Sequence, residues 1–266
     1  MKIFTAETLE QTAGSMTTIY GDTGSGKTIA ALATAPHPIL MITGERRAPA
    51  RMIDFVKGSP NMQPKPRDDL RIIVATPAGF DDLMDYLCDD RQLYKEDGDR
   101  IFKTVLLDGI SHFMSITLAN EIANQHFESL PVKDQQKKKL TRQSKLTEEG
   151  YGTMADEMLR LINRLGALSQ DGHHVIITAL IESNPSYDRA LVAAPLFAGR
   201  KFGKIFPGAM DLIGLVRPRV DGSNAVVYPP TVNFVSDGTF MAKMTGDVPG
   251  GPVQQLNFSR ILGEEG

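Results

Sequence analysis

Short apolar runs alternate along the chain with longer segments in which apolar residues recur every three or four positions. The short runs are bounded by glycine, proline or charged residues, as buried strands are, and they span residues 15–20, 38–43, 71–76, 103–108, 173–180 and 211–217. The longer segments have the periodicity of helices that bury one face, and they span residues 28–35, 48–57, 77–88, 110–130 and 151–168. This alternation predicts an α/β fold with a mostly parallel central sheet and helices on both faces.

The last part of the chain departs from this pattern, because its apolar runs follow one another without helices between them. The runs 231–235 and 239–244 flank Ser236-Asp237-Gly238, which predicts a β-hairpin and an antiparallel C-terminal extension of the sheet. Residues 181–208 are interpreted as a long loop, and the tail from about 250 to 266 as extended, partly mobile chain. Since neither a repeat nor a linker is visible, we expect one domain over 1–266, with its core at about 15–250.

The sequence GDTGSGKT, residues 21–28, lies between the first predicted strand and helix and fits the phosphate-binding pattern G-x-x-x-x-G-K-[ST]. Glycines 21, 24 and 26 are expected to take positive φ, so that backbone N–H groups surround an anion beside a helix N-terminus. Lys27 is predicted to reach the β- and γ-phosphates, and Thr28 to offer its hydroxyl to Mg²⁺. The alternative is a chance match, which the flanking strand and helix argue against. The predicted nucleotide-binding residues are Gly21, Asp22, Thr23, Gly24, Ser25, Gly26, Lys27, Thr28 and Ile29.

A second candidate motif is the apolar run KTVLLD, which ends in an acidic residue, Asp108. An acid at the carboxyl end of a central strand lies beside the P-loop in an open α/β sheet, where it can hold Mg²⁺ directly or through water. The alternative is an aspartate that caps the following helix. The P-loop upstream favours the metal role, so Thr28 and Asp108 are the predicted metal ligands.

Composition narrows the classes of function. The chain has 266 residues, 41% of them hydrophobic, and a formal net charge of −3, so a contact with nucleic acid requires a local basic patch. The single cysteine, Cys88, excludes an intramolecular disulfide and fits a reducing cytoplasm, and its helical position predicts a buried thiol. No signal peptide or apolar stretch of ~20 residues is visible, so a soluble cytoplasmic protein is expected.

Two segments are locally basic. Phosphate contacts require exposed Lys and Arg, and the candidates are Lys133, Lys137, Lys138, Lys139, Arg142, Lys145, Arg200, Lys201 and Lys204. The second segment also carries Phe197, Phe202 and Phe206, aromatic residues that could stack on the bases of a single strand. Composition alone favours the alternative of solvated charges and core phenylalanines.

The order of these motifs resembles the phage RecA-like ATPases of the single-strand annealing (Sak) group. The resemblance covers about residues 15–250 and rests on GDTGSGKT, an acid closing the second strand, TVLLDGISHF, Tyr-Gly before a long helix, HHVIITAL and FMAKMTG. It implies a RecA-like P-loop NTPase fold, ATP and Mg²⁺ as ligands, and a ring or filament of identical subunits. It further implies action on single-stranded DNA in phage recombination, with a single-strand-binding protein as a further partner, in the host cytoplasm.

The resemblance also assigns catalytic roles beside Lys27 and Asp108. Glu45 falls where such proteins place the glutamate that activates the attacking water, and Thr178 where they place a γ-phosphate sensor, although RecA has Gln there. Lys243 falls where related proteins supply a cation to the neighbouring subunit's ATP. The alternatives are a surface acid paired with a neighbouring arginine for Glu45 and a solvated hairpin lysine for Lys243.

Two other classes of function stay open. One is a motor ATPase, such as a helicase or a DNA-packaging subunit, and the other is a non-catalytic module that uses nucleotide as a switch. A GTPase is disfavoured because the guanine-selecting pattern N/T-K-x-D is not found; the nearest match, at 131–134, begins with proline.

Overall fold

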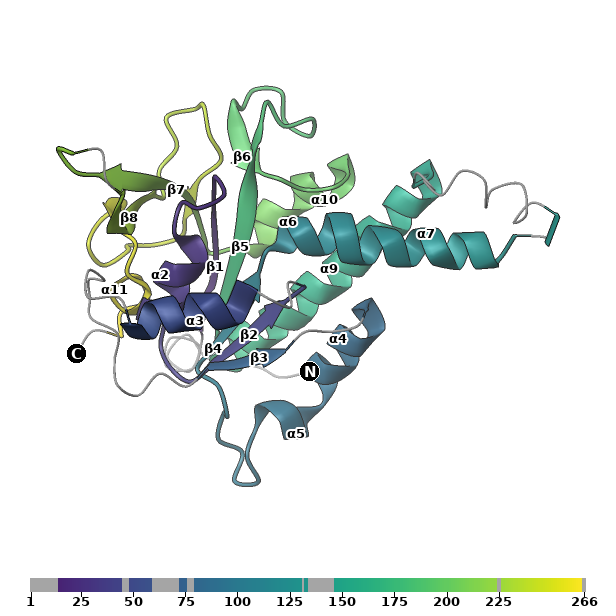
Figure 1. The fold of residues 1–266 in the computed structure, drawn as a ribbon, viewed down its shortest axis with the longest axis horizontal. Coiled ribbons are helices and arrows are strands. Elements are labelled where there is room, and N and C mark those ends of the chain that lie inside the picture. Colours follow the sequence, from purple (N-terminus) through teal and green to yellow (C-terminus); the bar gives the residue numbers. More distant parts are fainter. Residues whose placement is uncertain are drawn as a thin grey trace.

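The computed structural model describes residues 14–44, 48–58, 72–75, 79–130, 132–133, 146–223 and 226–264. The described strands form a sheet of ten, in which β10-β8-β7-β1-β5-β4-β2-β3 are neighbours in that order, while β6 pairs with β5 and β9 with β7 (Figure 1). Their bounds are β1 Met16–Gly21, β2 Ile39–Thr43, β3 Ile72–Ala75, β4 Thr104–Asp108, β5 His174–Ser183, β6 Ala193–Pro195, β7 Leu212–Val220, β8 Val226–Asn233, β9 Lys243–Met244 and β10 Val253–Gln255.

The central strands from β7 to β3 are all parallel to their neighbours, whereas β6, β8, β9 and β10 pair antiparallel. This confirms the predicted α/β class, including the antiparallel C-terminal extension. The order also has a consequence for the site. Since β5 lies between β1 and β4, the strand that ends in the P-loop and the strand that ends in Asp108 are separated by the strand that carries Thr178.

Helices cover both faces of this sheet (Figure 1). One face packs against α2, α3 and α11, and the other against α4, α7, α9 and α10. Neighbouring strand residues alternate between the two cores, as Ile19 and Tyr20 do, which is why the strands read as unbroken apolar runs. The helical segments are α2 Lys27–Thr34, α3 Ala48–Gly58, α4 Phe80–Cys88, α5 Asp90–Leu93, α6 Ile110–His112, the π-helical η1 Phe113–Leu118, α7 Ala119–Glu128, α9 Glu148–Gln170, α10 Arg200–Ile205, the 3₁₀-helical η2 Phe206–Ala209 and α11 Phe258–Ile261.

The interpretation of residues 181–208 as a long loop is wrong. β5 continues to Ser183, β6 pairs back onto it, and α10 and η2 follow. Phe197, Phe202 and Phe206 are buried and pack on one another, with ring centroids 4.6–5.3 Å apart. They therefore belong to the core and do not form a stacking surface for bases, which corrects that part of the nucleic-acid prediction.

The predicted hairpin is also wrong in its pairing. Asp237 and Ser236 do form a turn, in which the Asp237 carboxylate accepts a hydrogen bond from the backbone N–H of Thr239. However, the strands on either side of this turn do not pair with each other. Both lie along the same edge of β7, where β8 pairs with residues from Leu215 onward and β9 with Leu212 and Ile213.

The C-terminal tail is ordered onto the sheet, contrary to the expectation of an extended segment. β10 pairs with β8, and Leu256 and Phe258 are fully buried. The backbone N–H of Phe258 donates to the Thr34 hydroxyl at 2.9 Å, and the Ser259 hydroxyl donates to the Thr34 carbonyl. The tail thereby closes the end of α2, the helix that begins at the P-loop.

Cys88 is exposed, which corrects the prediction of a buried thiol. The apolar face of α4 consists of Phe80, Leu83 and Leu87, all buried. Cys88 is the last residue of the helix, so the apolar stripe ends one residue before it.

Candidate nucleotide-binding site

The P-loop joins the end of β1 to the start of α2 at the carboxyl edge of the sheet. Gly24 and Gly26 have φ of +79° and +88°, the left-handed region that glycine tolerates, as predicted. Gly21 differs from the prediction, because it is part of the strand and its φ is not positive. A Cβ at Gly21 would lie 2.5 Å from the Val216 carbonyl oxygen, so close approach of β7 explains this glycine.

Lys27 folds back onto this loop. Its ammonium donates to the carbonyls of Gly21 and Asp22, at 2.9 and 2.8 Å, and to the Ser25 hydroxyl, at 3.1 Å. The side chain is buried, and this burial lowers the pKa of Lys27 to about 8, although the carboxylates of Asp108 and Asp22 act in the opposite direction. A phosphate oxygen is a stronger acceptor than these uncharged groups, so the ammonium is placed to exchange them for a nucleotide.

Asp108 accepts two hydroxyl hydrogen bonds on the same oxygen. Thr28 from the P-loop helix donates to its Oδ1 at 2.6 Å, and Thr178 from β5 donates to it at 2.7 Å. The backbone N–H of Gly109 in turn donates to the Thr178 hydroxyl at 2.8 Å. Three segments that are distant in the sequence thus meet at one carboxylate, as the strand order requires.

The Thr28 hydroxyl and the Asp108 carboxylate are oxygen ligands of the kind that Mg²⁺ prefers. Within the described residues there is no cluster of three or more His, Cys, Asp or Glu side chains that could hold a metal ion. Mg²⁺ keeps several waters and usually binds through one or two carboxylates together with the phosphates of a substrate. The residues therefore fit the predicted cation, with Thr28 and Asp108 as the groups that would hold it.

The remaining predicted catalytic residues are less directly tied to this centre. Glu45 lies outside the described residues; Thr43, which ends β2, is in register with Asp108. The Lys243 ammonium donates to the carbonyls of Pro207, at 3.0 Å, and Met210 in its own chain. To reach a neighbouring subunit's nucleotide it would have to give up both bonds, so we omit Lys243 from the proposed catalytic set.

The predicted DNA-contact residues are only partly within the described chain. Lys133, Arg200, Lys201 and Lys204 are exposed. Lys201 forms an ion pair with Asp156 of α9 at 2.5 Å. Within the described part of the chain, Arg200 and Lys204 are the two cations of α10 that form no ion pair with a carboxylate. Outside the described residues lie Lys137, Lys138, Lys139, Arg142 and Lys145.

Two aromatic residues beside the P-loop were missed by the sequence reasoning. The ring of Tyr228 in β8 lies against Gly26, where an added Cβ would be 2.6 Å from its Cε1 atom. The ring of Phe55 in α3 meets the Tyr228 ring edge to face, with centroids 5.8 Å apart. No local sequence pattern predicts this contact, because the two residues come from distant parts of the sequence.

A phosphate-binding loop between strand and helix, a buried lysine, and a strand-end aspartate beside the loop threonine define a P-loop NTPase. In agreement, the family model described as an AAA domain matches residues 13–243, and the chain belongs to this family. It therefore carries a nucleotide-binding domain of the ATPase type. No curated protein sequence matches the chain significantly.

Among the described residues, no helix combines the length and the apolar character needed to cross a membrane.

Proposed function

We propose that this protein binds ATP with Mg²⁺ at the carboxyl edge of its sheet and hydrolyses it slowly, and that it acts on single-stranded DNA during phage recombination by annealing or strand pairing. The observation that carries the ATPase part is the convergence of the Thr28 and Thr178 hydroxyls on Asp108, beside the buried ammonium of Lys27. Residues with these charges at these positions match the needs of phosphoryl transfer.

Each residue would contribute one element of the chemistry. Bound Mg²⁺ would neutralise charge on the β- and γ-phosphates. Lys27 would release the carbonyls of Gly21 and Asp22 and donate to phosphate oxygens instead. Thr178 would keep the Asp108 carboxylate turned toward Thr28. Glu45, which follows β2 and Gly44, would orient the attacking water, the role that the family resemblance implies.

The DNA part of the proposal rests on the basic segments and on the resemblance to the Sak group. Arg200 and Lys204 supply positive charge on α10, while the buried phenylalanines remove the stacking surface that was expected there. We propose electrostatic contact with the phosphate backbone, together with a homo-oligomeric ring or filament along the strand.

The test is ATP turnover with and without single-stranded DNA, in wild-type protein and Lys27→Ala. We expect turnover that DNA stimulates and that the variant lacks. Unchanged turnover in Lys27→Ala would contradict the active site. Turnover that is indifferent to DNA would contradict the recombination role and leave an ATPase with another partner, such as a motor.

A matched pair of variants tests the proposed DNA contact on α10. Arg200→Glu with Lys204→Glu should weaken DNA binding and flatten its salt dependence. Lys95→Glu, which changes an exposed lysine in the segment 94–100, is the control and should alter neither quantity. Equal effects of the two changes would remove α10 from the interface.

A further inference from the structure

The position of Asp108 sets the direction in which a nucleotide would lie across the P-loop. Asp108 and Thr178 belong to β4 and β5, which lie on one side of β1. The γ-phosphate end of a nucleotide is the end that Lys27, Thr28 and Mg²⁺ hold. The nucleoside end must therefore leave the loop on the other side, past Gly26 and toward β7 and β8.

The aromatic pair stands on that side. Tyr228 packs directly on Gly26 at the start of α2, and Phe55 of α3 lies 5.8 Å from it, with an angle of 62° between the ring planes. The two rings thus come from different elements and meet next to the phosphate-binding loop.

The pair is not part of the closed core. Phe55 is 40% exposed, although its neighbour Val56 is fully buried, and Tyr228 is only half-buried, although Pro230 and Val232 on the same strand are buried. An exposed phenylalanine contributes little to the stability of the fold. Its exposed part can contact a flat ligand that follows the phosphates.

We propose that Tyr228 and Phe55 bind the base of the nucleotide, by stacking, and that they favour purine over pyrimidine nucleotides because a purine covers more of the rings. This inference rests on the proposed binding of ATP at the P-loop. It adds a base-binding subsite that lies beyond the phosphate-binding residues 21–29, and it makes Tyr228 and Phe55 the residues that determine nucleotide affinity at the nucleoside end.

The experiment compares two ligands that share their phosphates but not their base, namely ATP and inorganic tripolyphosphate, each with Mg²⁺. Binding is measured by calorimetry for wild-type protein, Phe55→Ala and Tyr228→Leu, in which leucine keeps an apolar contact on Gly26. We expect ATP affinity to fall about tenfold in each variant, and CTP to bind the wild type about tenfold more weakly than ATP. Tripolyphosphate affinity should not change.

Two further variants control for general effects of aromatic residues. Tyr228→Phe retains the ring and should retain ATP affinity. Tyr151→Ala removes an aromatic ring whose exposed fraction, 45%, is close to that of Phe55. Tyr151 belongs to α9, on the opposite face of the sheet, so this change should also leave ATP affinity unchanged.

Several results would overturn the inference. Equal losses of ATP and tripolyphosphate affinity would show that the two rings only support the phosphate-binding loop. If ATP affinity were unchanged in both Phe55→Ala and Tyr228→Leu, the two rings would be excluded from the nucleotide site. Wild-type protein that binds tripolyphosphate as tightly as ATP would overturn the base subsite alone. Wild-type protein that binds neither ligand would overturn the proposed function, and this inference with it.

Discussion

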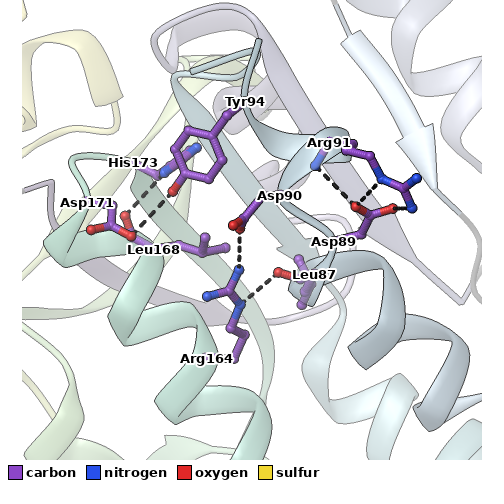
Figure 2. A network of polar contacts seen from close by, with 9 residues as sticks. All are labelled: Leu87, Asp89, Asp90, Arg91, Tyr94, Arg164, Leu168, Asp171 and His173. Atoms are coloured by element: carbon purple, nitrogen blue, oxygen red, sulfur yellow. Dashed lines mark hydrogen bonds and ion pairs between the residues drawn. The ribbon is translucent and has the colours of Figure 1, made fainter. Parts of the chain in front are cut away.

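The two edges of the sheet both hold buried titratable side chains, but their polar groups are arranged for different purposes. At the carboxyl edge, the ammonium of Lys27 and the hydroxyls of Thr28 and Thr178 converge on a glycine-rich loop and one carboxylate. At the amino edge, a comparable network joins the ends of helices (Figure 2).

At that amino edge, several bonds join segments that are distant in the sequence. Arg164 of α9 donates to the Leu87 carbonyl at the end of α4, at 2.7 Å, and the Tyr94 hydroxyl donates to Asp171 at 3.4 Å. His173 is fully buried; its Nδ1 donates to the Leu168 carbonyl at 3.2 Å, and the Tyr94 ring stands against it. A shifted pKa is therefore not sufficient to mark a functional site, and the open glycine loop is what distinguishes the carboxyl edge.

The largest expected effect at the amino edge is on stability in acid. Burial lowers the pKa of His173 from 6.5 to about 4, so the unfolded chain binds the proton more readily than the folded protein. The contribution of His173 to the free energy of unfolding is fully present above pH 6.5. About 3 kcal/mol of it should be lost as the pH falls to 4.

Urea unfolding of wild-type protein and His173→Asn at pH 7 and pH 4 measures this loss. The asparagine amide can keep the bond to Leu168 but does not titrate, so the variant should lose about 3 kcal/mol less than the wild type. His126→Asn, at an exposed position of α7, is the matched control and should follow the wild type. Identical losses in all three proteins would contradict this role of His173.

At the carboxyl edge, a smaller effect is expected from Thr178→Val. The change removes the Thr178 hydroxyl, which donates to Asp108, and leaves the shape of the side chain, so kcat should fall about 30-fold while ATP affinity changes little. The measurement is steady-state turnover together with ATP binding.

Thr17→Val is the matched control for that variant. Thr17 is buried on the adjacent strand β1, and within the described chain its hydroxyl has no hydrogen-bond partner, so its removal should leave turnover unchanged. Equal losses in both variants would show that any buried threonine of these strands matters for packing alone.

The smallest expected effect is the dependence of ATP affinity on pH. Because the pKa of Lys27 is lowered to about 8, the free protein loses this positive charge as the pH rises from 7 to 9. ATP should then bind up to about tenfold more weakly at pH 9 than at pH 7. Lys27→Arg keeps its charge over this range and should show a flat profile, even where its affinity is lower. Parallel profiles would assign the dependence to another group.

The carboxyl edge was more predictable from sequence than the rest of the molecule, because its residues follow local rules. Gly24, Gly26 and Lys27 lie within one short motif, and Asp108 closes an apolar run, so strand order alone brings them together. Thr178 could be named only through the family resemblance, since a threonine within a strand carries no signal of its own.

The errors fall where the outcome depends on tertiary contacts. α10 has only six residues, too few to show a helical period. Composition favoured core phenylalanines here, and only the family resemblance favoured aromatics exposed for bases. The runs beside Gly238 both pair with β7, a choice that the turn sequence does not encode. Tyr228 and Phe55 meet only because α3 crosses the face of the sheet beside α2.

The most direct test of the account measures ATP turnover and thermal unfolding side by side in wild-type protein, Lys27→Ala and His173→Asn. We predict that Lys27→Ala stays folded and loses at least about 100-fold in turnover, whereas His173→Asn keeps its turnover at neutral pH. A Lys27→Ala protein that hydrolyses ATP at the wild-type rate would contradict the assignment of the carboxyl edge as the nucleotide site.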